Sequence, residues 1–186
     1  MIDFAGNPLL CPWQCPVTGN WHYLLKNAKG GIQIPPYYAS SALSSDEKLI
    51  WGYLRHGPQT VDGVSPHPGD AKSDLVIADL HRGEMYYTSG GLRYPSAVMD
   101  EKRQLFFFIR GASIYSVDLQ AKNERCWMTL PESITKYGPL LSFGCHLSLS
   151  ADGCRLGLDG RFGTFTFVGF YDLEVNKFEV LLSAQD

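Results

Sequence analysis

The sequence lacks long apolar runs and has no excess of positive charge. None of its 186 residues belongs to an apolar stretch long enough to span a bilayer, and the amino terminus has neither the basic nor the apolar part of a signal peptide. The formal net charge is −3, so no global basic field is present to attract nucleic acid. We therefore expect a cytoplasmic protein that binds neither membranes nor nucleic acid.

Motifs that would identify a catalytic centre are also missing. The sequence has no nucleophile elbow, phosphate-binding loop or paired carboxylates in a recognisable context, so the catalytic residues stay unknown at this level. Cys11 and Cys15 could form half of a metal site, but no second Cys or His pair has a matching spacing. Incidental thiols are the simpler interpretation. The cysteines are odd in number, which favours free thiols in a reducing compartment: Cys11, Cys15, Cys126, Cys145 and Cys154.

Helical patterns are scarce, whereas residues typical of strands and tight turns are abundant. Aromatic residues make up 13% of the chain, and 19 Gly and 11 Pro are scattered along it. The only helix candidate, Pro131 to Tyr137, is bracketed by Pro and Gly and predicts a single turn at most. With 45% hydrophobic and 19% charged residues, the composition indicates a globular all-β protein with a sizeable core.

One local pattern occurs three times. Each copy has a turn centred on an acid, a hydrophobic strand, a second strand that ends in Asp-Leu or near it, and a further strand. The turn acids Asp46, Asp100 and Asp152 recur about every 50 residues, which is within the range of propeller repeats with inserted loops. We therefore predict about three four-stranded antiparallel sheets, or blades, of an incomplete β-propeller ring. A β-sandwich is the rival architecture, but it has no need of tandem self-similarity.

The blade boundaries follow from the copies. The predicted ranges are 1–37 for an amino-terminal segment with a partial blade strand, 38–92 for the first blade, 93–145 for the second blade and its connecting loop, and 146–186 for the third blade. In the amino-terminal segment, Trp21 to Leu25 reads as the last strand of a preceding blade. In the first copy, an insertion from His56 to Asp70 separates the second strand from the third.

Strands and turns can be assigned most clearly in the third copy. The predicted strands are His146 to Ser150, Arg155 to Asp159, Thr164 to Asp172 and Phe178 to Leu182. The connecting turns contain Gly153 and Asn176, two residue types that tolerate positive φ. In the second copy the same reasoning predicts strands Leu105 to Ile109, Ser113 to Val117 and Arg125 to Leu130.

These repeats resemble a known family. The run SLSADGCRL is similar to the TolB-like and WD40-like propeller repeats, and the segments PVTGNWHYLL, IPPYYASSALSSDEKLIWGY and KYGPLLSFGCHLSLSADGCRLGLDG look like the opening blades of oligogalacturonate lyase. The resemblance covers the chain from about Pro16 onward. It implies a cytoplasmic propeller that cleaves short galacturonate oligomers by β-elimination, a step of pectin degradation.

The same resemblance implies a divalent metal such as manganese, held by His and Gln side chains, with an Arg as base. The family carries these groups in later blades, beyond the part that this chain resembles. His67-Pro68 is similar to the family's His-Pro-His ligand motif, but it lacks the second His and the strand that should follow. No metal ligand is therefore assigned, and no cofactor is expected in this chain itself.

A repeated arginine is the best candidate for ligand binding. Arg55, Arg110 and Arg161 follow the three turn acids at nearly the same spacing, at the end of the second strand of each copy. Guanidinium groups that converge on one face could bind the carboxylates of an acidic sugar chain, since Arg offers a planar bidentate fork. His146, at the predicted start of a strand near the central channel, is a further candidate. Alternatively, each Arg pairs with a nearby acid or stacks on an aromatic ring, and His146 is structural.

Other clusters have a simpler structural interpretation. A metal site in the insertion would combine His56 and His67 with Asp62 or Asp70, but a loop rich in Pro and Gly is more often merely exposed. Sugar-stacking platforms could come from Tyr37 and Tyr38, Phe106 to Phe108, and Phe162, Phe165 and Phe167, although alternation along strands favours packing between blades.

Two hypotheses about function remain. The chain is either the amino-terminal part of a lyase-like propeller, inactive alone, or a non-enzymatic scaffold. In the second case it would bind a partner or a second copy through open blade edges.

Overall fold

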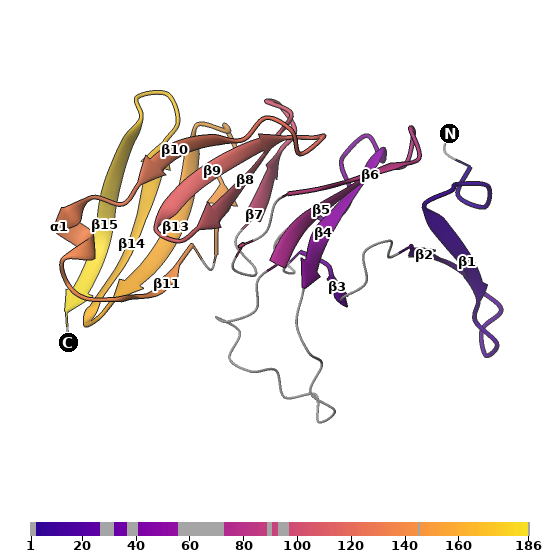
Figure 1. Cartoon of the computed structure of the whole chain (residues 1–186), viewed down its shortest axis with the longest axis horizontal. Helices are drawn as coiled ribbons and strands as arrows, with labels where there is room; N and C mark the ends of the chain where they lie inside the picture. Colours follow the sequence, from indigo (N-terminus) through magenta and orange to yellow (C-terminus); the bar gives the residue numbers. More distant parts are fainter. Residues whose placement is uncertain are drawn as a thin grey trace.

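The computed structural model is almost entirely β-structure. It describes residues 3–26, 32–36, 41–55, 73–88, 91–92, 97–144 and 146–185. Four separate antiparallel sheets follow one another along the chain and lie in a row, with the two termini at opposite ends of the row (Figure 1). None of the sheets closes on itself. The prediction of an all-β, incomplete propeller is confirmed. No helix in the described ranges is long and apolar enough to cross a membrane.

The first sheet is a two-stranded hairpin, which we call the N-terminal hairpin. It consists of β1 (Leu10–Gln14) and β2 (Trp21–Leu25). The strand predicted at Trp21 to Leu25 is therefore present with the same bounds, but it pairs with β1 and not with a four-stranded sheet. The strand β1 was not predicted, because Pro12 in its centre argues against a strand.

Three larger sheets correspond to the three sequence copies, and we call them the first, second and third blades. The first blade has β3 (Ile32–Ile34), β4 (Leu49–Arg55), β5 (Ser73–Asp79) and β6 (Glu84–Tyr87). The second has β7 (Ala97–Asp100), β8 (Leu105–Arg110), β9 (Ser113–Asp118) and β10 (Arg125–Thr129). The third has β11 (Leu140–Phe143), β12 (Ser148–Leu149), β13 (Arg155–Phe162), β14 (Phe165–Asp172) and β15 (Lys177–Gln185).

Two strands lie outside the ranges from which the sequence patterns were drawn. β3 falls in the predicted amino-terminal segment and pairs with β4. β11 falls in the predicted connecting loop and pairs with β13. The predicted helical turn is present as α1 (Glu132–Thr135), directly after Pro131. Gly153 and Asn176 both have positive φ, as their places in the turns require.

The repeated Ser and Asp residues build the turns by hydrogen bonding. In the first blade, Ser44 Oγ donates to Asp46 Oδ1, which accepts the N–H of Lys48, while Ser44 Oγ accepts the N–H of Leu49. Ser150 and Asp152 repeat this arrangement in the third blade. The acids at the ends of the third strands act similarly, each accepting two backbone N–H groups of the following turn: Asp79, Asp118 and Asp172. The repeated sequence pattern therefore reflects hydrogen bonds that recur in the turns of successive blades.

The second blade is buried on both faces. Successive side chains of β8 alternate between two cores: Phe106 and Phe108 pack with the first blade, whereas Phe107 and Ile109 pack with the third blade. All four are fully buried. This placement explains why β8 is a continuous apolar run, since a strand covered on both faces needs apolar residues at every position.

Hydrogen bonds also join neighbouring blades at the turns that precede β4, β8 and β13. Ser45 N–H and Oγ both donate to the Glu101 carboxylate, which joins the first blade to the second. Arg103 Nη1 bonds Asp100 Oδ2 at 2.8 Å and the carbonyl oxygen of Gly153 at 2.5 Å, which joins the second blade to the third. Arg103 thus bridges the two blades. Its bond to the Asp100 carboxylate is charge-assisted because both groups are ionised, and burial of Asp100 shields it from water.

Candidate functional site

The repeated arginines lie near the same end of β4, β8 and β13, but Arg110 is one residue out of register with the other two. Its side chain therefore points to the opposite face of its blade. Arg55 is the last residue of β4, Arg110 is the last of β8, and Arg161 is the last but one of β13. These three strands run toward the same edge of the row of blades, the lower edge in Figure 1. The repeat therefore places one guanidinium group per blade at a common edge.

Arg110 is held by its own blade. Its Nη1 and Nη2 bond the two carboxylate oxygens of Glu124 at 2.7 and 2.9 Å. The guanidinium also lies 5.3 Å from the ring centre of Phe108 and 5.0 Å from that of Tyr115. The hydrogen bonds to Glu124 raise the pKa of Arg110. The alternative raised by the sequence, pairing with an acid and stacking on rings, describes this residue.

Arg161 and Arg55 differ from Arg110 in their surroundings. Arg161 is exposed on the outer face of the third blade, where its Nε donates to the carbonyl oxygen of Gly163 at 3.4 Å. Arg55 is half-buried and immediately precedes residues outside the described part of the chain. Both stay at the same edge as Arg110, but only Arg161 is broadly open to solvent.

His146 lies in a turn, not at the start of a strand. The prediction that a strand begins there is wrong: β12 starts at Ser148, because the His146 N–H instead donates to Asp159 Oδ1 at 3.2 Å. Its Nδ1 is 3.5 Å from Asp159 Oδ2. The exposed imidazole borders a shallow hollow on the outer face of the third blade, which Arg155 and Phe170 also line.

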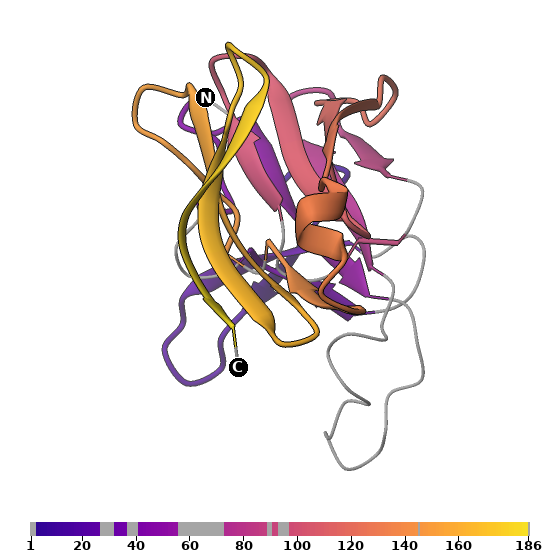
Figure 2. The same ribbon diagram turned by 90° about the vertical axis from the view of Figure 1, so that its left-hand side faces the viewer.

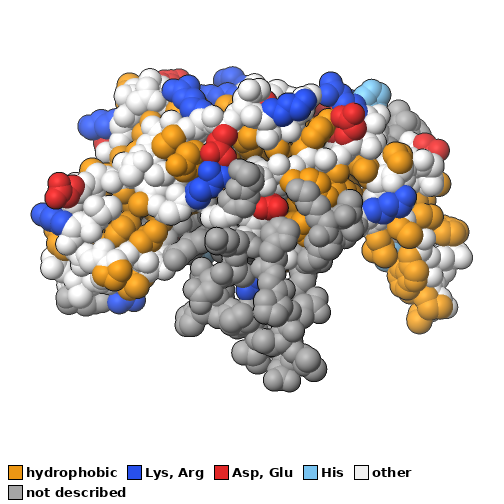
Figure 3. All heavy atoms as spheres, in the orientation of Figure 1, with side chains coloured by type: hydrophobic (Ala, Val, Ile, Leu, Met, Phe, Trp, Pro, Cys, Tyr) orange, Lys and Arg blue, Asp and Glu red, His pale blue; other side chains and the backbone are white. Residues whose placement is uncertain are grey.

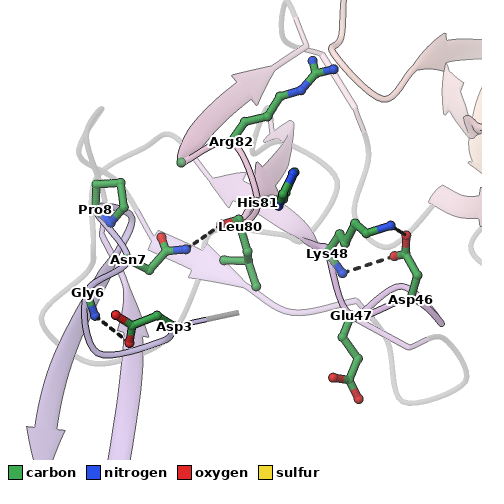
Figure 4. Close-up of a pocket in the computed structure, with 11 residues that line it drawn as sticks. Asp3, Gly6, Asn7, Pro8, Asp46, Glu47, Lys48, Leu80, His81 and Arg82 are labelled. Atoms are coloured by element: carbon green, nitrogen blue, oxygen red, sulfur yellow. Dashed lines mark hydrogen bonds and ion pairs between the residues drawn. The ribbon is translucent and has the colours of Figure 1, made fainter. Parts of the chain in front are cut away.

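A polar pocket that sequence reasoning missed lies on the opposite edge of the first blade. It is bounded by the amino-terminal residues Asp3 to Pro8, the turn Asp46 to Lys48 and the turn Leu80 to Gly83 (Figure 4). Asn7 closes one side, since its Nδ2 donates to the carbonyl oxygen of Leu80 at 2.6 Å. The pocket could not be read from the sequence because it joins segments far apart along the chain.

The charges around this pocket are partly paired. The Lys48 Nζ lies 2.8 Å from Asp46 Oδ2, and hydrogen bonds from Lys48 and Ser44 lower the pKa of Asp46 to about 2. His81 and Arg82 extend from the turn that follows β5 (Figure 4). Lys48, His81 and Arg82 also line a neighbouring hollow with Gln104 and Gln120 of the second blade. This edge therefore carries acidic as well as basic side chains, so its charge does not single out an anionic ligand.

The remaining candidates do not form a site. The residues His56, Asp62, His67 and Asp70 of the proposed metal site, the proposed platforms Tyr37 and Tyr38, and Cys145 lie outside the described residues. Within the described ranges, no group of three or more His, Cys, Asp or Glu side chains could hold a metal ion. The four described cysteines are free thiols: Cys11, Cys15, Cys126 and Cys154. Phe106 to Phe108, Phe162, Phe165 and Phe167 are all buried in the cores.

Comparison with known proteins supports the fold. No family model matches the chain, and no curated protein matches it. An oligogalacturonate lyase from Vibrio parahaemolyticus is similar in structure, with a TM-score of 0.67 and 14% identity over 94% of this chain and 46% of the lyase. TolB from Acinetobacter baumannii is similar with a TM-score of 0.53 and 13% identity over 97% of this chain and 40% of TolB. An oligogalacturonate lyase in complex with manganese gives a TM-score of 0.48 at 14% identity, covering 93% of this chain and 47% of that one.

These likenesses establish the architecture of the chain. It has the fold of a TolB-like β-propeller that resembles oligogalacturonate lyase. The chain spans less than half the length of either protein. The four sheets of the described residues, none of them closed, thus form an incomplete propeller.

Proposed function

We propose that this chain binds acidic oligosaccharides at the arginine edge of its blades, as the amino-terminal part of a lyase-like propeller. The observation that carries the proposal is that Arg55, Arg110 and Arg161 lie near one edge of three successive blades. Arginine remains charged at every physiological pH, and its fork matches a carboxylate. A row of such groups suits a polymer with one carboxylate per sugar.

The chain contributes binding to such a reaction, not its chemistry. β-Elimination from a galacturonate needs a base to remove the proton next to the carboxylate and a cation to stabilise the resulting charge. The described residues offer no cluster for a metal ion. In our proposal, manganese or another divalent metal and the base belong to further blades, and this chain alone has no lyase activity.

Titration calorimetry with trigalacturonate tests the binding. We expect Arg161→Gln to weaken binding roughly two- to fivefold, the effect of one exposed charge contact. Arg155→Gln is the matched control, since Arg155 is an exposed arginine at the other end of the same strand. Neutral trigalactose should not bind.

Two results would contradict the proposal. One is a trigalacturonate affinity that Arg161→Gln and Arg55→Gln leave unchanged, and the other is equal binding of the neutral sugar. Formation of unsaturated product by this chain with manganese would contradict the assignment of the base and metal to other blades.

A second function is favoured by a different observation. Both ends of the row of blades present apolar side chains to solvent, including Trp21 in β2 and Leu182 in β15. An open end of this kind is typical of a surface that contacts another protein. We therefore also propose a scaffold function, in which the ends of the row bind a partner chain.

A further inference from the structure

Arg55 and Arg110 face the same interface because they are out of register. Arg55 lies on the same face of β4 as Tyr53, which packs with the second blade. Arg110 lies on the same face of β8 as Phe108, which packs with the first blade. Seen along the row, the blades lie one behind another (Figure 2), so each of these two arginines faces the other's blade. Arg161 is on the outer face of the third blade and is not part of this interface.

Ser73 lies between the two arginines. It pairs with Arg55 across β4 and β5, so their side chains are neighbours on one face of the first blade. The backbone of Ser73 also exchanges two hydrogen bonds with that of Leu92, at 3.2 and 3.1 Å. A Cβ on the preceding residue, Gly91, would lie 3.9 Å from Arg110 Nε. These contacts lead step by step from Arg55 through Ser73 to Arg110.

Two buried polar atoms at this interface have no hydrogen-bond partner among the described residues. One is Ser73 Oγ, in a residue that is 0% exposed, and the other is Arg110 Nε. Glu124 does not satisfy this nitrogen, because it accepts only from Nη1 and Nη2 of Arg110. A buried polar group without a partner is unfavourable, and native proteins seldom keep one that has no role. The pair therefore indicates a place where a ligand atom is bound.

The charges at this interface favour an anion. Arg55 and Arg110 are both positive, and Glu124 offsets only one of the two charges. One carboxylate would balance the remaining charge and accept hydrogen bonds from Ser73 Oγ and Arg110 Nε. Elsewhere on the face shown in Figure 3, basic side chains are scattered and acidic ones lie beside several of them. The excess of positive charge between the first two blades is thus a local feature.

We propose that the interface between the first and second blades binds one carboxylate of an acidic sugar at the arginine edge. Ser73 Oγ and Arg110 Nε donate hydrogen bonds to it, and Arg55 supplies the opposite charge. This inference rests on the proposed binding of acidic oligosaccharides and names the residues that recognise a single sugar unit. Arg161 then contacts only a longer chain.

Titration calorimetry of the full chain with galacturonate, a sugar with one carboxylate, tests the proposal. We expect galacturonate to bind and galactose not to bind. Ser73→Ala should weaken galacturonate binding roughly tenfold, as for the loss of one hydrogen bond to a charged group. Arg55→Gln should weaken it at least as much, whereas Arg161→Gln should leave it unchanged. Ser148→Ala, in β12 of the third blade, is the matched control.

Urea denaturation of Ser73→Ala without sugar separates binding from a structural role. Because the hydroxyl has no partner among the described residues, its removal should not lower the free energy of unfolding. A structural hydroxyl would instead show a loss of stability. Arg110→Lys adds a second test, since lysine keeps the charge but lacks the Nε–H, and it should also weaken galacturonate binding.

The outcomes distinguish this inference from the proposed function. Galacturonate binding that Ser73→Ala and Arg55→Gln leave unchanged would overturn the inference, as would binding of trigalacturonate without binding of galacturonate. Both results would leave the proposed function in place. If neither sugar binds, both are removed. Galacturonate binding no tighter than acetate would show that the interface recognises the carboxylate alone, which removes the sugar from the inference.

Discussion

At the scale of single residues, glycines at equivalent turns have different roles. Gly111 follows β8 and Gly163 follows β13, and their φ angles are +59° and +53°. A Cβ on Gly111 would meet nothing within 4 Å, whereas a Cβ on Gly163 would lie 2.2 Å from the carbonyl oxygen of Tyr137. The first turn needs glycine only for its φ, and the second also needs it for space.

The two glycines give a matched test. Gly111→Ala should lower the free energy of unfolding by about 1 kcal/mol, the cost of the left-handed conformation. Gly163→Ala adds the clash with backbone, so its loss should be larger by at least about 1 kcal/mol. Urea denaturation of both variants measures the difference. Equal losses would mean that the approach of Tyr137 to the turn does not constrain residue 163.

The conformation of turn residues could be predicted from the local sequence, whereas contacts with residues distant in the sequence could not. Gly153 and Asn176 could be assigned positive φ because the short loops around them require it. Nothing local to His146 indicates that Asp159, in another strand, would bond its backbone N–H. Likewise, the sequence offers Arg110 several acids, and only the fold selects Glu124.

At the scale of elements, β8 is the strand on which two cores depend. Phe107 is fully buried on the side of the second blade that faces the third, and its ring centre lies 5.6 Å from that of Trp127 in β10 of its own blade. Phe107→Ala should lower the free energy of unfolding by about 3–5 kcal/mol, because the cavity lies in a close-packed interface. Val175→Ala, in an exposed turn, should change it by less than about 0.5 kcal/mol.

Chemical denaturation of both variants checks this expectation. A loss below about 1 kcal/mol for Phe107→Ala would show that the interface between the second and third blades is loosely packed. The control guards against a general effect of truncating an apolar side chain.

Strands with strong alternation or continuous apolar runs could be predicted closely. The range Ser113 to Val117 lies within one residue of β9, and Thr164 to Asp172 within one residue of β14. The first strand of the third blade was harder, because it is divided into β11 and β12 around Gly144, whose φ is +61°. A strand interrupted in this way has no continuous period for sequence reasoning to detect.

At the scale of the whole molecule, the exposed apolar side chains Trp21, Val168 and Leu182 affect how stability is measured. If the partner in the proposed scaffold function is a chain of the same kind, folding and association are linked, and the thermal midpoint rises with protein concentration. We expect this rise for the unaltered chain and not for the double variant Val168→Lys and Leu182→Lys. Differential scanning calorimetry over a roughly hundredfold range of concentration measures it. A midpoint independent of concentration in both would indicate a stable lone chain.

The overall architecture could be predicted because repetition is visible in sequence, whereas the ends of the row could not. The spacing of Asp46, Asp100 and Asp152 reports three similar units and therefore three blades. No pattern within one chain reports which apolar surface another chain covers. The N-terminal hairpin shows this most clearly, since Trp21 to Leu25 was predicted as the last strand of a blade, whereas Trp21 is 59% exposed in a two-stranded sheet.

The alternation of Phe106, Phe107 and Phe108 in β8 also bears on how the molecule comes apart. Each neighbouring blade covers only one face of this strand, so removing the first would expose Phe106 and Phe108 to water and removing the third would expose Phe107 and Ile109. The three blades consequently depend on one another for cooperativity. We expect truncation after Thr129 to yield a molten or aggregating remnant and not a smaller folded protein, and we expect the three blades to unfold in a single transition.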